Sequence, residues 1–445
     1  MLETCRLMIH MSNKNNKRNI GIIAVVIVII AAVAGGYYYS TSASTSSQNM
    51  EASSMMSTET SAMVTSMTNQ VPATSTEASM MTTETSMSSS VAGWQPSGPV
   101  SLLGAGATFP QPLIQKWTVT YNQLYPAVTI SYSGIGSGGG IQQITAKTVD
   151  FGASDAPLNT AQFAAAPGLV IFPETLGGVA VTYNLATFGI PNNTTLRFTS
   201  SVLAGIYMGE ITKWNDPQIE ALNPGVNFPS SLITAVHRSD GSGTTFAFTH
   251  FLSVTNTTWA NHVGYSTSVT WPVDDAPNAN GVGAKGNPGV AGAVKNTNGA
   301  IGYVDVIYAI SNNLGVGSVL NQAGNFVVPT LQTILYAAQN ATGTPSLSTL
   351  TGSAFPSGIT IVNAAGGQSY PICTYTYILV YQDMSKNVNS MDKAKTLAHF
   401  LWWAIHDGQQ YSTALIYVPL PANVVSVDEQ LLMTLNYQGT PLLTS

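Results

Sequence analysis

Three kinds of hydrophobic and polar pattern follow one another along the 445-residue chain. Residues 20–39 form an uncharged apolar run that ends in three tyrosines. Residues 40–95 are almost wholly Ser, Thr, Met and Ala, with a few Glu. From residue 99 onward, short apolar runs alternate with amphipathic stretches. The pattern predicts a membrane-spanning segment, a linker too polar to bury a core, and a folded region.

The apolar run predicts a single-pass anchor in the cell membrane. About twenty residues of helix extend about 30 Å, the thickness of one hydrocarbon core. A group of basic residues precedes the run, and the next basic residue is Lys116. By the positive-inside rule, residues 1–18 are cytoplasmic, residues 19–39 cross the membrane, and the rest is extracytoplasmic. A cleaved signal sequence is the alternative, because small Ala and Gly residues end the run.

The Ser/Thr-rich region, residues 40–98, is predicted to be a disordered stalk. Farther along the chain, N-x-Ser/Thr sequons occur at Asn192, Asn193, Asn256 and Asn340. They agree with an external glycoprotein, although such short sequons also arise by chance in Asn- and Thr-rich chains.

The folded region opens with alternating strand and helix patterns. Apolar runs predict strands at residues 100–103, 128–132 and 149–153, and a short helix is predicted over 141–146. An earlier helix is predicted because four apolar residues share one helical face: Leu113, Trp117, Tyr121 and Leu124. This βαβαβ order predicts an α/β fold with a mostly parallel sheet.

A strand, a small-residue turn and a helix are also predicted over residues 232–252. The apolar run 232–236 is followed by His237 and then by Arg-Ser-Asp-Gly-Ser-Gly (238–243), and Thr244 or Thr245 is expected to cap a helix. Similar turns occur at 104–109 and 134–140. Backbone N–H groups at helix starts bind anions, and ligands of open α/β sheets lie at the carboxyl ends of strands. We therefore expect the three turns to converge on one anion site.

Two alternatives remain open for these turns. The segment after residue 236 could be a surface turn with a local Arg238–Asp240 pair. Gly134, Gly136 and Gly139 formally match the dinucleotide fingerprint, with Asp155 as the ribose acid. A lone GxGxxG is weak evidence, and an external domain is a poor place for a nicotinamide enzyme.

Composition narrows the function classes. Charged residues make up only 8% of the chain, against roughly 25% in ordinary soluble proteins. With a net charge of −6 and no basic patch, the chain is not expected to bind nucleic acid. Cys5 and Cys373 are too few for a disulfide framework or a cysteine zinc site, and the histidines lack metal-binding spacing. No metal and no cofactor are therefore predicted.

Three long stretches closely resemble the periplasmic phosphate-binding protein of the high-affinity phosphate ABC transporter. They are GAGATFPQPLIQKW (104–117), GIGSGGGIQQITAKTVDFGASDAPL (134–158) and HRSDGSGTTFAFTHFL (237–252). The resemblance covers roughly residues 99–440. It implies a two-lobed, type II periplasmic-binding-protein-like α/β fold, with residues 99–180 plus 371–445 as lobe one and 181–370 as lobe two.

The resemblance also implies a set of phosphate ligands. They are Thr108, Phe109, Ser137, Asp155, Arg238, Ser242, Gly243 and Thr244, with Asp240 orienting Arg238. Phe109 and Gly243 would offer backbone N–H groups. Asp155 would accept a proton from phosphate and repel sulfate, which has no proton to give at neutral pH. The plainer interpretations are a turn cap for Asp155 and a helix cap for Thr108. His237 stands where the family often has Arg or Lys, and is not expected to touch the ion.

The resulting prediction is a binding protein rather than an enzyme. As a monomer, it would capture inorganic phosphate outside the cell and deliver it to the permease subunits of an ABC transporter. The alternatives are a secreted phosphatase-like enzyme, for which Ser242 lacks an evident His base, and a membrane-tethered phosphate sensor. We expect the hydrophobic core to contain Trp117, Trp214 and Trp271.

Overall fold

The computed structural model describes residues 94–341, 343, 345–351 and 360–444. The predicted cytoplasmic segment 1–18, the predicted anchor 19–39 and the predicted stalk up to residue 93 lie outside the described residues. Within the described part of the chain, no helix combines the length and the apolar character needed to cross a membrane.

The first part of the described chain has the predicted βαβαβ order. Its elements are β1 (Val100–Gly106), α3 (Gln111–Leu124), β2 (Val128–Gly134), α4 (Ser137–Thr145) and β3 (Phe151–Ser154). The central strand β1 is parallel to both β2 and β3. The α3 helix buries Leu113, Trp117 and Tyr121, as its pattern predicts. Leu124 is 54% exposed, so that part of the prediction is wrong, because the helix ends there.

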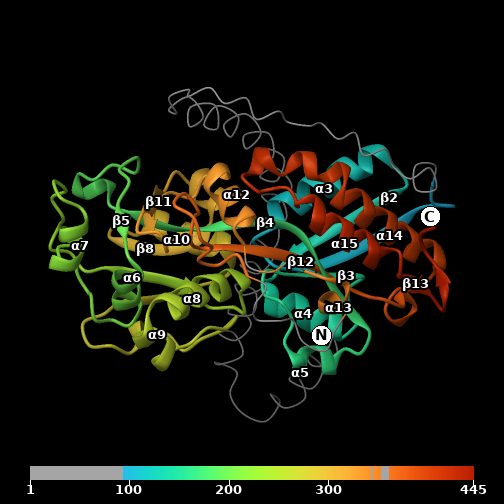
Figure 1. The fold of residues 1–445 in the computed structure, drawn as a ribbon, viewed down its shortest axis with the longest axis horizontal. Helices are drawn as coiled ribbons and strands as arrows, with labels where there is room; N and C mark the ends of the chain where they lie inside the picture. The colour runs from blue at the N-terminus through green and yellow to red at the C-terminus, as the bar shows by residue number, and fades with distance from the viewer. Residues whose placement is uncertain (1–93, 342, 344, 352–359, 445) are drawn as a thin grey trace, which may run out of the picture. The chain divides into compact units, whose positions relative to one another are not determined.

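Two long strands connect the halves of the fold (Figure 1). The sheet order is β2-β1-β3-β12-β4-β8-β6-β7. Strand β4 (Leu169–Asn184) pairs with β12 (Cys373–Tyr381) up to Gly178 and with β8 (Ala300–Asp305) from Val179 onward. Every residue of β4 and β12 is buried. The two halves are therefore connected by continuous, hydrogen-bonded β-strands.

The second half repeats the strand–turn–helix arrangement. Strand β6 (Thr234–Arg238) lies parallel to β7 (Gly281–Ala284) and β8. Helix α8 (Gly243–Thr255) follows β6, and α10 (Gly286–Asn296) follows β7. The remaining strands are β5 (Arg197–Phe198), β9 (Gly315–Val316), β10 (Ser318–Leu320), β11 (Phe326–Val327), β13 (Asn436–Tyr437) and β14 (Thr440–Pro441). The remaining helices are α5 (Thr160–Ala165), α6 (Ser200–Tyr207), α7 (Pro217–Leu222), α9 (Thr257–His262), α11 (Val306–Ser311), α12 (Leu331–Gln339), α13 (Leu347–Leu350), α14 (Met391–Ile405) and α15 (Ala422–Leu432).

The cap of α8 differs from the prediction. Ser242, and not Thr244 or Thr245, is the N-cap, because its hydroxyl oxygen accepts a hydrogen bond from the Thr245 N–H at 3.0 Å. Ser242 is still extended, at φ −131° and ψ 126°, whereas the helix already begins at Gly243. The core prediction holds, because Trp117, Trp214 and Trp271 are at most 5% exposed. Helix α8 also buries Phe248, Phe251 and Leu252 completely.

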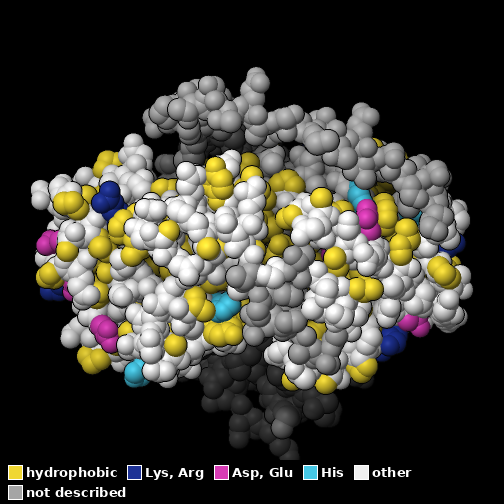
Figure 2. Space-filling model, in the orientation of Figure 1, with side chains coloured by type: hydrophobic (Ala, Val, Ile, Leu, Met, Phe, Trp, Pro, Cys, Tyr) yellow, Lys and Arg dark blue, Asp and Glu magenta, His cyan; other side chains and the backbone are white. Residues whose placement is uncertain are grey.

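The low charge of the surface matches the low fraction of charged residues in the sequence. On the face drawn in Figure 2, charged side chains are few and scattered among uncharged ones. The described ion pairs are correspondingly sparse, and the most buried of them is Arg238–Asp240, with side chains 1% and 13% exposed. The burial of this pair points to the turn after β6.

Candidate anion-binding site

The turn after β1 meets the start of α10. Thr108 is 2% exposed, and its hydroxyl oxygen accepts hydrogen bonds from the Asn287 backbone N–H and from Asn287 Nδ2, both at 3.0 Å. The cap of α3 is Pro110, without a side-chain cap bond, so Thr108 does not cap that helix. Thr108 instead ties the first half of the fold to the second.

Asn287 was not predicted as a site residue. Its Nδ2 also donates to Thr244 Oγ1 at 3.1 Å, and its Oδ1 accepts from the Asp305 N–H at 3.0 Å. The oxygens of Thr108 and Thr244 are thus both acceptors for one amide group. Because a hydroxyl has a single hydrogen, Thr108 can direct its hydrogen toward a ligand, whereas the Thr244 hydrogen faces Asp155 Oδ2 at 3.5 Å and would have to turn to reach one.

Ser137 occupies the corresponding place at the start of α4. Its hydroxyl oxygen accepts from the Gly243 N–H at 2.9 Å and from the Asp155 N–H at 3.2 Å. The Gly243 N–H, which sequence reasoning expected to face the ligand, is therefore directed at Ser137 in this structure. We call Thr108, Ser137, Ser242 and Thr244 the hydroxyl cluster. Each oxygen in it accepts from an N–H donor.

Arg238 is the cation of the site. Its Nε donates to Asp240 Oδ1 at 2.8 Å and its Nη2 to Asp240 Oδ2 at 2.6 Å, which confirms the expected pair. Its Nη1 reaches Thr244 Oγ1 at 3.4 Å. Burial alone would raise the pKa of Asp240, but the hydrogen bonds and charge of Arg238, with the Gly286 N–H, lower it. Asp240 therefore stays ionised and holds the guanidinium plane in place.

Asp155 lies at the end of β3 and is 1% exposed. Thr376 donates to its Oδ1 at 3.1 Å, and Thr244 Oγ1 lies 3.5 Å from its Oδ2. Burial raises the pKa of Asp155 to about 7, despite the opposing charge of Arg238 and the hydrogen bonds from both threonines. Ser154, rather than Asp155, makes the turn bond, accepting from the Ala156 N–H at 3.1 Å. Asp155 is thus not a turn cap.

Phe109 lies beside an interaction between the two halves. Tyr417 donates to the Phe109 carbonyl at 2.6 Å and lies 2.6 Å from Asp305 Oδ2. The tyrosine has one hydrogen and the carbonyl can only accept, so both contacts are hydrogen bonds only if the Asp305 carboxyl is protonated and donates to Tyr417. Burial raises the pKa of Asp305 well above its usual range, in agreement with a neutral carboxyl.

Glycines allow the turns of the two halves to touch. The Gly138 N–H donates to the Gly241 carbonyl at 2.9 Å. A Cβ on Gly243 would lie 2.4 Å from Asp155 Cβ, and one on Gly136 would lie 2.2 Å from Asp240 Oδ2. Larger residues would separate the turns.

The structure brings all the predicted site residues together, by direct contact or as chain neighbours.

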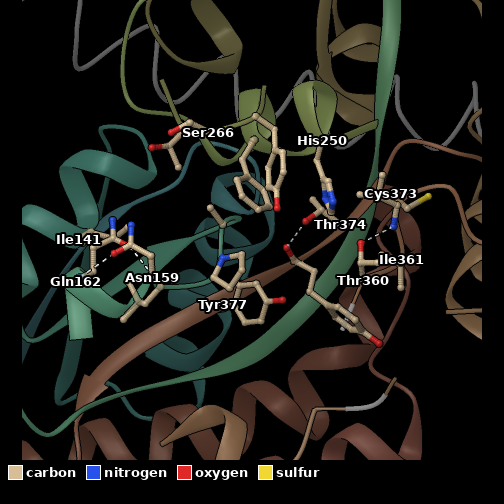
Figure 3. A pocket seen from close by; sticks show the side chains of 18 residues that line it. Ile141, Asn159, Gln162, His250, Ser266, Thr360, Ile361, Cys373, Thr374 and Tyr377 are labelled. Atoms are coloured by element: carbon tan, nitrogen blue, oxygen red, sulfur yellow. Dashed lines mark hydrogen bonds between the residues drawn. The ribbon is translucent and has the colours of Figure 1, made fainter. Parts of the chain in front are cut away.

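A cavity of about 350 Å³ borders this cluster. Asn159 and His250 line it from opposite halves of the fold, and Thr374 lines it from β12 (Figure 3). Thr374 donates to the Asp155 carbonyl at 3.1 Å, so the cavity reaches the edge of the site. None of the predicted ligand residues lines the cavity, and their side chains are buried, so the cluster itself is enclosed.

His237 does not serve Ser242. Its Nε2 lies 2.8 Å from Asp274 Oδ1, and its ring stacks on Trp271 at 4.9 Å. The Ser242 hydroxyl oxygen accepts the hydrogen bond that caps α8. The described residues also contain no group of three or more His, Cys, Asp or Glu side chains arranged to hold a metal ion.

Comparison with known proteins agrees with the resemblance. A family model described as a PBP superfamily domain matches residues 73–407. The phosphate-binding protein PstS of Xylella fastidiosa (strain 9a5c) is 41% identical over 326 residues, covering 73% of this chain and 83% of the relative. The phosphate-binding protein PstS of Methanocaldococcus jannaschii is 36% identical over 329 residues, covering 72% and 83% of the two chains. The chain belongs to the PstS family of the PBP superfamily.

This member of the PstS family shares its fold with solved structures of low sequence identity. A high affinity periplasmic phosphate-binding protein (PfluDING) bound with phosphate at pH 8.5 has a TM-score of 0.59 at 21% identity, covering 74% of this chain and 93% of that chain. The phosphate binding protein from Stenotrophomonas maltophilia has a TM-score of 0.54 at 19% identity, covering 73% and 92%. These matches confirm the two-lobed α/β periplasmic-binding-protein-like fold.

Two residues that touch the site of this PstS family member were missed from the sequence. Asn287 lies at a fourth strand–glycine–helix turn, after Gly286, whose φ of +69° favours glycine. Glu174 is a lone acid in the apolar strand β4, 3.1 Å from the Thr376 hydroxyl that binds Asp155. The available signals were the repeated turn pattern for Asn287 and the isolated charge for Glu174.

Proposed function

We propose that this protein binds inorganic phosphate between its two lobes and delivers it to the permease subunits of an ABC transporter. The observation that carries the proposal is an enclosed cluster with one cation, four hydroxyls whose oxygens already accept from N–H donors, and one carboxyl beside them. Such a site offers hydrogen-bond donors on most sides and one hydrogen-bond acceptor. This combination suits an oxyanion that carries a proton. The names of its relatives support this ligand.

The proposed ligands are those expected from the resemblance. Thr108, Ser137, Ser242 and Thr244 would donate hydroxyl hydrogens, and Arg238 would supply the charge. The Phe109 N–H, which makes no hydrogen bond within the described residues, would donate directly. Gly243 would allow Asp155 to approach. Hydrogen bonds to a charged partner are worth about 1.5–3 kcal/mol each, and a micromolar affinity requires a surplus of about 8 kcal/mol.

Asp155 would select phosphate over sulfate. Phosphate keeps a hydroxyl at neutral pH and can donate it to the carboxylate, whereas sulfate cannot and would face an unrelieved negative charge. This role requires Asp155 to be ionised when the ion is bound. Burial raises the pKa of Asp155 to about 7, whereas the charge of Arg238 favours the ionised form.

The setting of the domain is also a proposal. We propose that residues 19–39 anchor the chain in the membrane, that residues 40–98 form an external stalk, and that the sequons carry glycans. We further propose lobe one at residues 99–180 plus 371–445, lobe two at 181–370, and a monomer that acts without catalysis. The change of partner along β4 at Gly178 supports this boundary between lobes.

The test is calorimetric titration of the full-length chain with phosphate and with sulfate. We expect one-to-one phosphate binding with sulfate excluded. In Asp155→Asn, the affinity ratio of phosphate to sulfate should fall by about tenfold or more, because the amide can donate to sulfate. Asp428→Asn, which changes a buried aspartate outside the cluster, serves as the matched control.

The outcome also separates the alternatives. No phosphate binding between pH 5 and 8 would refute the proposal. Steady release of phosphate from a phosphomonoester would favour the phosphatase-like enzyme instead. Phosphate binding without phosphate uptake in membranes that contain the permease would favour a sensor.

A further inference from the structure

Glu174 is a buried carboxyl next to the site that the proposed ligand set does not use. It lies in β4 and is 1% exposed. Its Oε2 has no hydrogen-bond partner, and none of the described ion pairs includes it. An ionised carboxyl with one unsatisfied buried oxygen is costly. The position therefore favours the neutral form.

A count of hydrogens leads to the same conclusion. Thr376 Oγ1 lies 3.1 Å from Asp155 Oδ1 and 3.1 Å from Glu174 Oε1. The hydroxyl has one hydrogen and can donate to only one of the two carboxyls. The other contact is a hydrogen bond only if that carboxyl is protonated and donates to Thr376. Both contacts are therefore hydrogen bonds only when one of the two carboxyls carries a proton.

The surroundings place that proton on Glu174. Asp155 has the charge of Arg238 and a contact from Thr244 to favour its ionised form, and Glu174 has neither. Burial, together with the charge of Asp155, raises the pKa of Glu174 to about 8, although its bond to Thr376 opposes the shift. Tyr132, on β2, is the other titratable group that Glu174 influences, and its hydroxyl donates to the Ala107 carbonyl.

We propose that Glu174 is a positioning residue for ligand discrimination. Its carboxyl hydrogen fixes the Thr376 oxygen, the Thr376 hydrogen is then held on Asp155, and Asp155 is left as an acceptor for the bound ion. This inference rests on the proposed function, because it concerns the same phosphate site. It adds a residue that does not touch the ion.

The Glu174–Thr376–Asp155 arrangement predicts how phosphate affinity changes at alkaline pH. When Glu174 ionises, Thr376 can no longer make both contacts, and a second negative charge lies one hydroxyl away from Asp155. Phosphate affinity should then fall by about tenfold for each pH unit above the pKa of Glu174, since binding requires its proton. The second ionisation of phosphate and the titration of Asp155 also affect affinity, so the effect must be read as a ratio between variants.

The decisive comparison is between the wild type and Glu174→Gln. The full-length proteins are titrated with phosphate by calorimetry at intervals from pH 6.5 to 9.5. The Gln amide donates to Thr376 at every pH, so the two dissociation constants should agree near pH 6.5. Above pH 8 the wild type should become weaker by about tenfold per pH unit relative to the variant. Asp428→Asn, the matched control, should follow the wild type.

A second pair of variants tests the same chain at Thr376. Thr376→Val removes the bridging hydroxyl and should lower the phosphate-to-sulfate ratio at pH 6.5, whereas Thr376→Ser should restore it. Parallel pH profiles for the wild type and Glu174→Gln, or an unchanged ratio in Thr376→Val, would overturn the inference. Absence of phosphate binding in the wild type at pH 6.5 would instead refute the proposed function, so the two failures are distinct.

Discussion

Replacing Asn287 by aspartate reverses the hydrogen-bonding role of one side chain in the site. In the native protein, Asn287 Nδ2 donates to Thr108 Oγ1 at 3.0 Å and to Thr244 Oγ1 at 3.1 Å. In Asn287→Asp an oxygen replaces that nitrogen, while the other oxygen can still accept from the Asp305 N–H. Both threonine hydroxyls would then turn their hydrogens toward the new carboxylate.

The expected loss follows from the number of donors removed. Two hydroxyl hydrogens that we propose for phosphate would be withdrawn, each worth about 1.5–3 kcal/mol as a hydrogen bond to a charged partner. The sum is about 3–6 kcal/mol, or about two to four orders of magnitude in the dissociation constant. The added negative charge acts in the same direction.

The assay is calorimetric titration with phosphate at pH 8, with a thermal melt to show that the variant is folded. Asn321→Asp is the matched control, because Asn321 is 5% exposed and its Nδ2 donates to three carbonyls away from the cluster. It should lower the melting temperature without changing phosphate affinity. A folded Asn287→Asp protein that binds phosphate within about twofold of the wild type would refute the reasoning.

Three further changes test other parts of the structure. Gly243→Ala would place a Cβ 2.4 Å from Asp155 Cβ, so calorimetry should show phosphate affinity reduced by at least about a hundredfold, and a thermal melt should show a lower melting temperature; retained affinity would contradict the close approach. Tyr417→Phe removes the contacts to the Phe109 carbonyl and Asp305, worth about 1–3 kcal/mol together, and should weaken phosphate binding about fivefold to a hundredfold; a change below twofold would count against it. Burial raises the pKa of Asp428 above 3.8, so the folded state favours its protonated form and this group lowers the unfolding free energy as pH rises. Asp428→Asn should therefore raise the melting temperature at pH 8 but not below pH 4, and an equal shift at both pH values would exclude this origin.

Local patterns predicted a large part of the fold and site. Each of the predicted turns joins a strand to a helix within a few residues, so the turns could be found without knowing any distant contact. The family resemblance then singled out Ser137 and Thr244 within them. The Arg238–Asp240 pair is separated by one residue and is equally local. The predicted N-cap of α8 was two or three positions too late. Ser242, Thr244 and Thr245 are all good cap residues, and only the backbone angle distinguishes them.

The missed residues depend on distant pairing. Strand β7 is Gly-Val-Gly-Ala, which has no apolar run to reveal the strand before Asn287. Glu174 meets Asp155 only through Thr376, and this requires the antiparallel register of β4 and β12, about two hundred residues apart in sequence. Register over such a separation follows from tertiary packing and not from local propensity. The isolated acid in β4 was therefore visible in the sequence but was not singled out, and its partner could not be found from the sequence.

The scarcity of surface charge has a kinetic consequence. Charged residues make up only 8% of the chain and are scattered on the face drawn in Figure 2, so we expect little long-range field to guide an anion toward the site. Electrostatic steering raises association rates and makes them fall steeply with ionic strength. We expect the association rate constant of phosphate to vary little with salt. The speed of capture would then depend on diffusion and on access to the enclosed cluster, and hardly at all on the salinity of the surroundings.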